Sequence, residues 1–270
     1  MVMINTEKIA KNIRINSLKM VHKAKASHIG SALSIVDIVA VLYGHVMKIN
    51  SENPKDENRD RFILSKGHAC VAVYAALAEL NIIPFSDLET YGDNFSWLMN
   101  HISHKVPGVE FSTGALGHGL PFAAGKALSA KINKSKWQIY VLLSDGEMDE
   151  GSNWEALMFA SHNKLSNLNI IIDYNKLQSL DTVQNTLSLE PLADKLRAFG
   201  CEVIEVNGHN HVELHSAFLK KNNSIPKVII AHTIKGKGVS FMENKVEWHY
   251  KNPNDDQLSL ALSEIERAYA

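Results

Sequence analysis

Short apolar runs alternate with helix-like patterns along most of the chain. The runs are rich in β-branched residues and end in polar turns, which predicts buried strands at 61–65, 138–143, 169–174, 202–206 and 227–231. Apolar residues recur at three- and four-residue steps elsewhere, which predicts helices. The predicted helices are 6–25, 34–47, a segment ending near 80, an Ala-rich segment after 119, 152–165, 191–199, 211–221 and 256–269. This alternation predicts an α/β fold with a doubly wound, mostly parallel sheet flanked by helices.

The stretch 137–180 predicts one strand–helix–strand unit around which the rest is organised. Its first strand ends at the acidic turn 144–147, and its second strand ends at Asn175. Ser152 and Glu155 have the spacing of a capping box, which predicts the start of the helix between the strands. Apolar residues on one face of that helix are Trp154, Leu157, Met158 and Leu165.

Polar residues at the ends of the two strands predict a site for a metal ion and a phosphate. Ligands bind at the carboxyl edge of such sheets, and Asp145 and Asn175 both lie there. A carboxylate, an amide oxygen and a nearby backbone carbonyl are hard ligands that suit Mg²⁺ or Ca²⁺. The loop 146–151, which opens a helix, offers free N–H groups to an anion. The alternative is an ordinary acidic turn with Asp145 in solvent.

Composition excludes several classes of function. The chain has 270 residues, 45% hydrophobic content and a formal net charge of −1, which predicts a soluble chain of one large domain or two small ones. No second domain boundary appears along the sequence, so we expect a single domain over 1–270. The sequence contains no basic block, so a nucleic-acid partner is not expected. It also contains no apolar run long enough for a membrane span, and its amino terminus lacks the apolar core of a signal peptide. Cys70 and Cys201 form no disulfide or metal pattern, so we expect a cytoplasmic protein.

Histidines and glycines gather in a few loops. His28 lies between two predicted helices, and His68 follows a strand at the amino end of a helix, where an imidazole can donate to a phosphate oxygen. Zinc is an alternative for His101, His104 and His118, but their spacing matches no zinc pattern. Glycine loops at 113–119 and 232–240 leave N–H groups free for an anion or a flat ligand, and Trp248-His249 follows the second loop.

Together these segments resemble the transketolase family. Asp145-Gly146, Glu150-Gly151, the segment 154–156 and Asn175, 30 positions after Asp145, are similar to the thiamin-diphosphate motif of that family. Ser144 replaces the usual first glycine, and Glu147 stands where a smaller residue is usual. Further similar segments are Ser-His-Ile-Gly at 27–30, Leu-Ser-Lys-Gly-His-Ala at 64–69, Thr-Gly-Ala-Leu-Gly-His-Gly at 113–119, with Ala115 in place of proline, and Lys-Gly-Lys-Gly at 235–238 followed by Trp-His.

The resemblance implies roles for individual residues. His28, His101 and His249 would face the sugar substrate and act in catalysis, since imidazoles titrate near working pH. Asp145 and Asn175, with the backbone carbonyl of Leu177, would bind Mg²⁺ or Ca²⁺. The residues implied to bind thiamin diphosphate are His68, Gly114, Ala115, Leu116, Asp145, Gly146, Glu147, Glu150, Asn175 and His249.

The resemblance covers only the diphosphate-binding domain of a transketolase. The family's pyrimidine-binding domain, with the glutamate that activates the cofactor, and its third domain have no counterpart here. We therefore expect the N-terminal subunit of a split transketolase, assembled as α₂β₂ with a C-terminal partner subunit, without which it would be inactive. It would transfer a two-carbon ketol unit from a ketose phosphate to an aldose.

Alternatives within the same resemblance are ketol transfer in the biosynthesis of unusual sugars and the role of a 2-oxo-acid dehydrogenase α-like subunit. A non-catalytic scaffold that holds the cofactor is a further alternative, because the carboxylate of Glu147 could repel a diphosphate.

Overall fold

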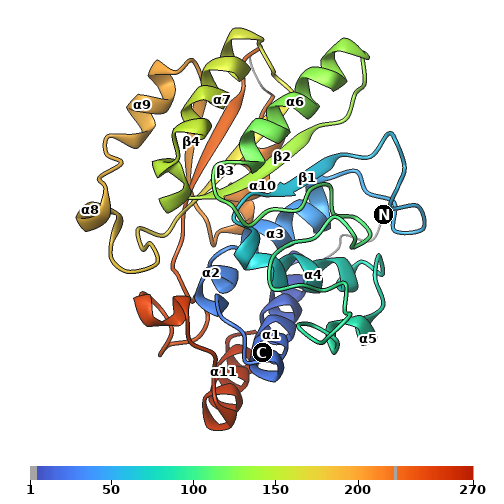
Figure 1. The fold of residues 1–270 in the computed structure, drawn as a ribbon, viewed down its shortest axis with the longest axis vertical. Helices are drawn as coiled ribbons and strands as arrows, with labels where there is room; N and C mark the ends of the chain where they lie inside the picture. The colour runs from blue at the N-terminus through green and yellow to red at the C-terminus, as the bar shows by residue number, and fades with distance from the viewer. Residues whose placement is uncertain (1–4, 222–223, 270) are drawn as a thin grey trace.

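The computed structural model describes residues 5–221 and 224–269, and these form a five-stranded sheet wrapped by helices (Figure 1). All neighbouring strands are parallel, in the order β1-β2-β3-β5-β4. The strands are β1 (Arg61–Leu64), β2 (Ile139–Ser144), β3 (Leu168–Tyr174), β4 (Glu202–Asn207) and β5 (Lys227–His232). The predicted doubly wound parallel sheet is confirmed, and each predicted strand is present within one or two residues of its expected ends.

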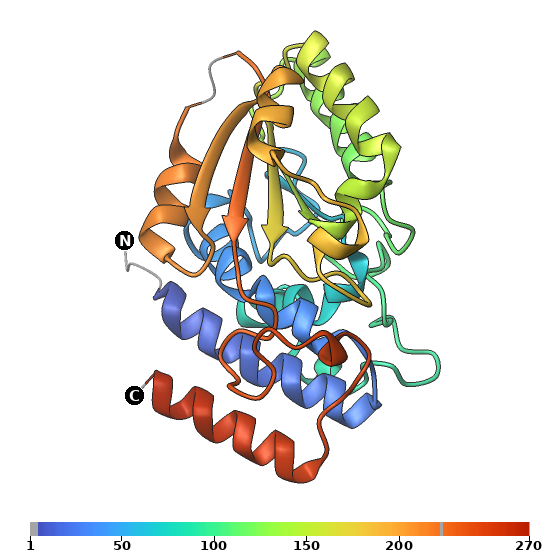
Figure 2. The same cartoon turned by 90° about the vertical axis from the view of Figure 1, so that its left-hand side faces the viewer.

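Helices cover both faces of the sheet. Successive strand residues point to opposite faces, so Leu142 and Leu143 belong to two different apolar clusters. One face packs against α6 (Gly119–Ile132), α7 (Gly151–His162) and α9 (Leu192–Ala198). The other packs against α3 (Val36–Val41), α4 (Cys70–Glu79) and α10 (His211–Leu219). Outside this layer, α1 (Thr6–Ala24) packs on α3 and α4, and α11 (Asp255–Ala268) packs on α1 (Figure 2).

Short helical turns fill the connections and bring functional loops to one edge. These turns are α2 (Ile29–Ser34), α5 (Phe85–Leu88), α8 (Val183–Thr186), the π-helical turn η1 (Leu42–Val46), and the 3₁₀ turns η2 (Gly67–Ala69), η3 (Gly146–Asp149) and η4 (Val246–His249). The strand arrows in Figure 2 point toward the end of the molecule that carries α1 and α2. The carboxyl edge of the sheet therefore faces the loops that follow each strand.

Two predicted helices differ from the observed ones. The helix expected over 34–47 is broken at Ile35, whose φ of −102° and ψ of 1° leave the helical region, giving α2, α3 and η1 instead. The predicted capping box of α7 is wrong, because Glu150 is the N-cap residue and the Ser152 hydroxyl donates to the carbonyl of Gly117, 2.6 Å away. Met158 is exposed, and Leu165 lies beyond the end of α7.

Some expectations concern the surroundings of the chain. Within residues 5–221 and 224–269, no helix combines the length and the apolar content needed to cross a membrane. Residues 1–4, which belong to the amino-terminal stretch without a signal-peptide pattern, lie outside the described residues. Cys70 and Cys201 are both buried free thiols.

Candidate cofactor and substrate site

A cavity of about 270 Å³ opens at the carboxyl edge of the sheet. Loops after β1, β2, β3 and β5 supply its walls, together with α2 and the segment before α6. Its lining residues are His28, Ser31, Lys66, His68, His101, Gly114, Leu116, Ser144, Asp145, Gly146, Asn175, Leu177, Gln178, Ser179, Lys235, His249 and Tyr250.

The three groups predicted to bind a metal ion all line this cavity. Asp145 accepts hydrogen bonds from the N–H groups of Gly146 (2.7 Å) and Lys176 (2.6 Å), which fix its carboxylate at the end of β2. Burial and the neighbouring Asp173 raise the pKa of Asp145 to about 7. A bound cation would remove this unfavourable desolvated charge, so the carboxylate fits a metal ligand.

Asn175 is oriented by the groups beneath it. Its amide nitrogen donates to the Ser34 hydroxyl (3.2 Å) and to the carboxylate of Asp173 (3.1 Å), and its oxygen accepts from the N–H of Leu177 (3.0 Å). Because the amide nitrogen is used in this way, the oxygen is the atom left with a free lone pair for a ligand. The donor set therefore consists of a carboxylate, an amide oxygen and a backbone carbonyl, which matches the oxygen preference of Mg²⁺ or Ca²⁺.

Asp173 forms a buried hub under Asn175. It is completely buried at the end of β3 and accepts a hydrogen bond from the ammonium of Lys66 at 2.5 Å. The hydroxyls of Ser34, at 2.7 Å, and Thr233 also donate to it. Burial alone would raise the pKa of Asp173, but the Lys66 ammonium and these hydrogen bonds hold it below the usual value. The hub therefore fixes the ends of β1, β3 and β5 relative to each other.

Four histidines line the cavity. The ring centroid of His28 lies 5.0 Å from those of His68 and His249 and 5.8 Å from that of His101. His28 has a φ of 75°, and its N–H donates to the carbonyl of His249 at 2.8 Å. The three histidines predicted to face a sugar are thus brought together from segments far apart in the sequence.

Burial keeps these imidazoles neutral. Desolvation, with the nearby Lys235, lowers the pKa of His249 to about 3, and desolvation with His101 and Lys235 lowers the pKa of His28 to about 4. Lys235 donates to Nδ1 of His249 at 3.0 Å, so the proton of a neutral His249 ring lies on Nε2. A neutral imidazole has one N–H donor and one acceptor nitrogen; since Lys235 occupies the acceptor of His249, this ring can donate a proton from Nε2 but offers no free acceptor.

Most of the predicted cofactor residues line the cavity, but three do not. Ala115 and Glu150 are exposed outside it. Glu147 is completely buried and accepts from the Ser65 hydroxyl (2.5 Å) and the N–H groups of Gly117 (3.0 Å) and Ser144 (3.4 Å). Its side chain therefore ties the glycine loop before α6 to the turn after β2.

Sequence reasoning missed several cavity residues. Ser31 lies on α2, three positions after the N-cap residue His28, and Lys66 and Lys235 line the cavity as well. The ammonium of Lys66 donates to the carbonyl of Ser31. Lys235 donates to the carbonyls of Leu177 (3.1 Å) and Gln178 (2.9 Å). Each lysine directly precedes a glycine, in the segments Lys66-Gly67 and Lys235-Gly236. These lysine–glycine pairs could have indicated the two lysines as cavity residues.

The histidines considered as zinc ligands, His101, His104 and His118, do not form a zinc site with one another. His104 pairs with the Ser112 hydroxyl at 2.7 Å, and His118 with the carbonyl of Leu116 at 3.0 Å. In the part of the chain that the structure describes, no group of three or more histidine, cysteine or acidic residues could hold a metal ion. The predicted metal ligands Asp145, Asn175 and Leu177 include a single acidic residue and therefore do not form such a group.

The carboxyl edge of this α/β sheet thus brings oxygen ligands, two lysines and four histidines to one cavity, a combination of groups that suits a metal-bound anion. A family model described as the transketolase thiamine diphosphate binding domain matches residues 5–264. The chain belongs to the transketolase family, and the predicted thiamin-diphosphate-binding fold is confirmed.

Relatives of similar length are themselves named as subunits. The chain is 41% identical over 250 residues to one subunit of the apulose-4-phosphate transketolase of Phocaeicola vulgatus, covering 92% of this chain and 89% of that protein. It is 39% identical over 267 residues to the 6-deoxy-6-sulfo-D-fructose transketolase subunit SqwG of a Clostridium species, covering 98% of this chain and 97% of that protein. The prediction of an N-terminal subunit of a split transketolase, and hence of a transferase subunit, is confirmed.

Complete transketolases are much longer. Human transketolase is 38% identical over 257 residues, covering 95% of this chain but 41% of the human protein. The crystal structure of the Campylobacter jejuni transketolase superposes with a TM-score of 0.92 at 31% identity, covering 97% of this chain and 42% of that one. The chain therefore spans less than half of these proteins.

Proposed function

We propose that this chain is the diphosphate-binding subunit of a two-chain transketolase that uses thiamin diphosphate and Mg²⁺. The observation that carries the proposal is the convergence of Asp145, Asn175 and Leu177 with His28, His101 and His249 on one cavity. The assembled enzyme, an α₂β₂ cytoplasmic complex, transfers a two-carbon ketol unit from a ketose phosphate to an aldose. When bound, the cofactor supplies a carbanion that cleaves and forms carbon–carbon bonds next to a carbonyl group.

In this proposal the residues of the chain bind the metal ion and the diphosphate and orient the sugar. Asp145, Asn175 and the Leu177 carbonyl would hold Mg²⁺ (Ca²⁺ has the same ligand preference), and His68 would hold the diphosphate. The prediction that the turn 146–151 offers free N–H groups to this anion is wrong at its start, because the N–H groups of Gly146, Glu147 and Met148 donate to Asp145 and Ser144. The remaining predicted cofactor residues, Gly114, Ala115, Leu116, Glu147 and Glu150, act as loop backbone or loop supports. His28, His101 and His249 move protons at the hydroxyls of the sugar.

Glu147 bears on the scaffold alternative. Its carboxylate is engaged by three donors inside the protein and does not line the cavity. Like-charge repulsion of a diphosphate by this side chain is thus weakened by distance and by its own hydrogen bonds. The geometry favours a catalytic subunit over a scaffold.

An unusual ketose that carries a phosphate or a sulfonate is a second candidate for the donor. Two relatives matched over most of their length are named for apulose 4-phosphate and 6-deoxy-6-sulfo-D-fructose. A panel that contains these ketoses, fructose 6-phosphate and a 2-oxo acid distinguishes the donors. Turnover of the 2-oxo acid alone would favour the dehydrogenase-like alternative.

The test is ketol transfer by the chain purified with and without the partner that carries the pyrimidine-binding and third domains. We expect turnover only in the complex, because the cofactor-activating glutamate belongs to the partner. Alanine at His28, His101 or His249 should lower the rate by about 10²- to 10⁴-fold, the usual contribution of general acid–base groups. His104→Ala is the matched control, since His104 lies outside the cavity. Turnover by the isolated chain, or an unchanged rate for all three variants, would refute the proposal.

A further inference from the structure

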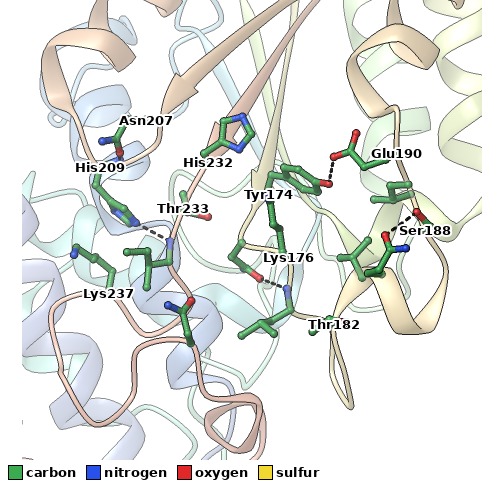
Figure 3. Close-up of a pocket in the computed structure, with 17 residues that line it drawn as sticks. Tyr174, Lys176, Thr182, Ser188, Glu190, Asn207, His209, His232, Thr233 and Lys237 are labelled. Carbon is green, nitrogen blue, oxygen red and sulfur yellow. Dashed lines mark hydrogen bonds between the residues drawn. The ribbon is translucent and has the colours of Figure 1, made fainter.

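A second cavity, of about 1030 Å³, lies on the other side of Asn175 and Leu177, between the 176–190 loop and the ends of β4 and β5 (Figure 3). His209 lines it from the turn after β4 and points toward the segment that follows β5 (Figure 3). There its Nε2 accepts the backbone N–H of Ile234 at 2.8 Å. Ile234 directly precedes Lys235, whose ammonium faces the cofactor cavity.

The tautomer of His209 follows from its two partners. Because Nε2 accepts from an N–H group, the ring carries its proton on Nδ1, which donates to the carboxylate of Asp37 at 2.7 Å. Asp37 is buried and receives two parallel hydrogen bonds from the guanidinium of Arg14, at 2.6 and 3.0 Å. Burial alone would raise the pKa of Asp37, but Arg14 and the two histidines hold it well below its usual value. The carboxylate is therefore a permanent acceptor that fixes the His209 ring.

The same ion pair reaches the segment on the other side of Lys235. Nε of Arg14 donates to the carbonyl of Lys237 at 3.2 Å. The Arg14–Asp37 pair thus contacts the backbone two residues after Lys235 directly, and one residue before it through His209. Lys235 is only 1% exposed, and its ammonium donates to the carbonyls of Leu177 and Gln178 and to His249.

We propose that His209, oriented by Asp37, is a positioning residue that fastens the segment carrying Lys235 against the cofactor cavity. Through Lys235 it sets the Leu177 carbonyl and the tautomer of His249. The significance of that cavity rests on the proposed function, but the fastening itself does not depend on it.

His211 provides a matched control within the same network. Its Nε2 donates to the other oxygen of Asp37 at 3.1 Å, and its Nδ1 pairs with the hydroxyl of Thr6 at 2.8 Å. Both of these partners lie outside the segment 233–238. Loss of His211 therefore perturbs Asp37 and the packing of α10 without releasing Lys235.

The test is the rate at which acetic anhydride acetylates Lys235 in the full chain, measured by peptide mass spectrometry and normalised to the exposed Lys251. His209→Asn keeps a donor near the Nδ1 position but lacks the acceptor for Ile234, and we expect acetylation of Lys235 to rise about tenfold, the change in opening that one lost buried hydrogen bond produces. His209→Gln places an acceptor at the Nε2 position and should restore most of the protection. His211→Ala should leave the Lys235 rate unchanged even if it lowers the melting temperature.

Equal acceleration in His211→Ala and His209→Asn, or no acceleration in His209→Asn, would overturn the proposal. Nitrogen-15 NMR of the unmodified chain is a second measurement that needs no variant. It should show His209 protonated at Nδ1, and protonation at Nε2 would contradict the hydrogen bond from Ile234. Neither readout involves turnover, so this proposal can fail while the proposed function holds, and the reverse.

Discussion

Removing the charge of Asp173 tests whether the buried hub under the cavity holds the sheet edge together. Lys66 and Asp173 are 1% and 0% exposed, and their charged atoms lie 2.5 Å apart. In Asp173→Asn the Lys66 ammonium stays buried without a carboxylate. Breaking one side of a buried ion pair costs about 3–5 kcal/mol, a large share of the roughly 5–15 kcal/mol by which domains are stable.

The assay is urea unfolding followed by circular dichroism at pH 7.5. With a slope of roughly 3 kcal/mol per molar urea, the expected loss lowers the midpoint by roughly 1–1.7 M. Asp194→Asn is the matched control, because Asp194 pairs with Arg197 on the exposed surface and its loss should cost less than about 0.5 kcal/mol. Two equal midpoint shifts would show that burial of the pair is not the cause.

A double-mutant cycle separates the pair from its surroundings. Lys66→Met removes the ammonium, and the double variant Lys66→Met with Asp173→Asn leaves no buried charge at either position. We expect the double variant to be more stable than the sum of the single losses predicts, by about 1–3 kcal/mol. Additive losses would refute the reasoning that the two charges stabilise each other.

Two further predictions concern the cavity walls. A Cβ at Gly67 would lie 2.5 Å from the backbone oxygen of Thr113, so Gly67→Ala should displace the 113–116 loop and weaken cofactor binding in a titration. A Cβ at Gly125 on α6 meets nothing within 4 Å, so Gly125→Ala should raise the free energy of unfolding by up to about 1 kcal/mol in thermal melts. Unchanged cofactor affinity in Gly67→Ala, or a lower melting temperature in Gly125→Ala, would contradict this. The pKa of His249 is about 3 in the folded chain and near 6.5 in the unfolded chain. Above pH 6.5 the ring is neutral in both states, and as the pH falls from 6.5 toward 3 only the unfolded chain takes up the proton, which lowers the free energy of unfolding. The stability of the wild type relative to His249→Gln should fall by up to about 1.4 kcal/mol per pH unit below 6.5, and a difference that stays flat between about pH 4.5 and 6.5 would exclude the buried neutral ring.

The sheet could be predicted from the sequence because parallel strands buried on both faces are short continuous apolar runs. Asp145 and Asn175 could be placed at its carboxyl edge for the same reason, since each directly follows such a run. Local pattern did not show the break at Ile35, because both sides of it are apolar and helical.

Residues that depend on distant contacts were harder to assign. Asp173 lies inside the apolar run of β3, and only the approach of Lys66, 107 positions earlier, explains a buried carboxylate there. The sequence also did not show that the side chain of Glu147 points into the protein, because its hydrogen-bond partners Ser65 and Gly117 come from other loops. The role of His209 likewise depends on Asp37, 172 positions away.

The proposed function depends on one divalent ion, which Asp145, Asn175 and the carbonyl of Leu177 would hold and which would anchor thiamin diphosphate in this chain. Calorimetric titration of thiamin diphosphate into the complex of the chain with its partner, with Mg²⁺ and then with EDTA, tests this directly. We expect binding in Mg²⁺, no binding in EDTA, and affinity weakened at least about tenfold in Asp145→Asn, since an amide is a poorer ligand than a carboxylate. Equal affinity with Mg²⁺ and with EDTA would contradict the metal anchor.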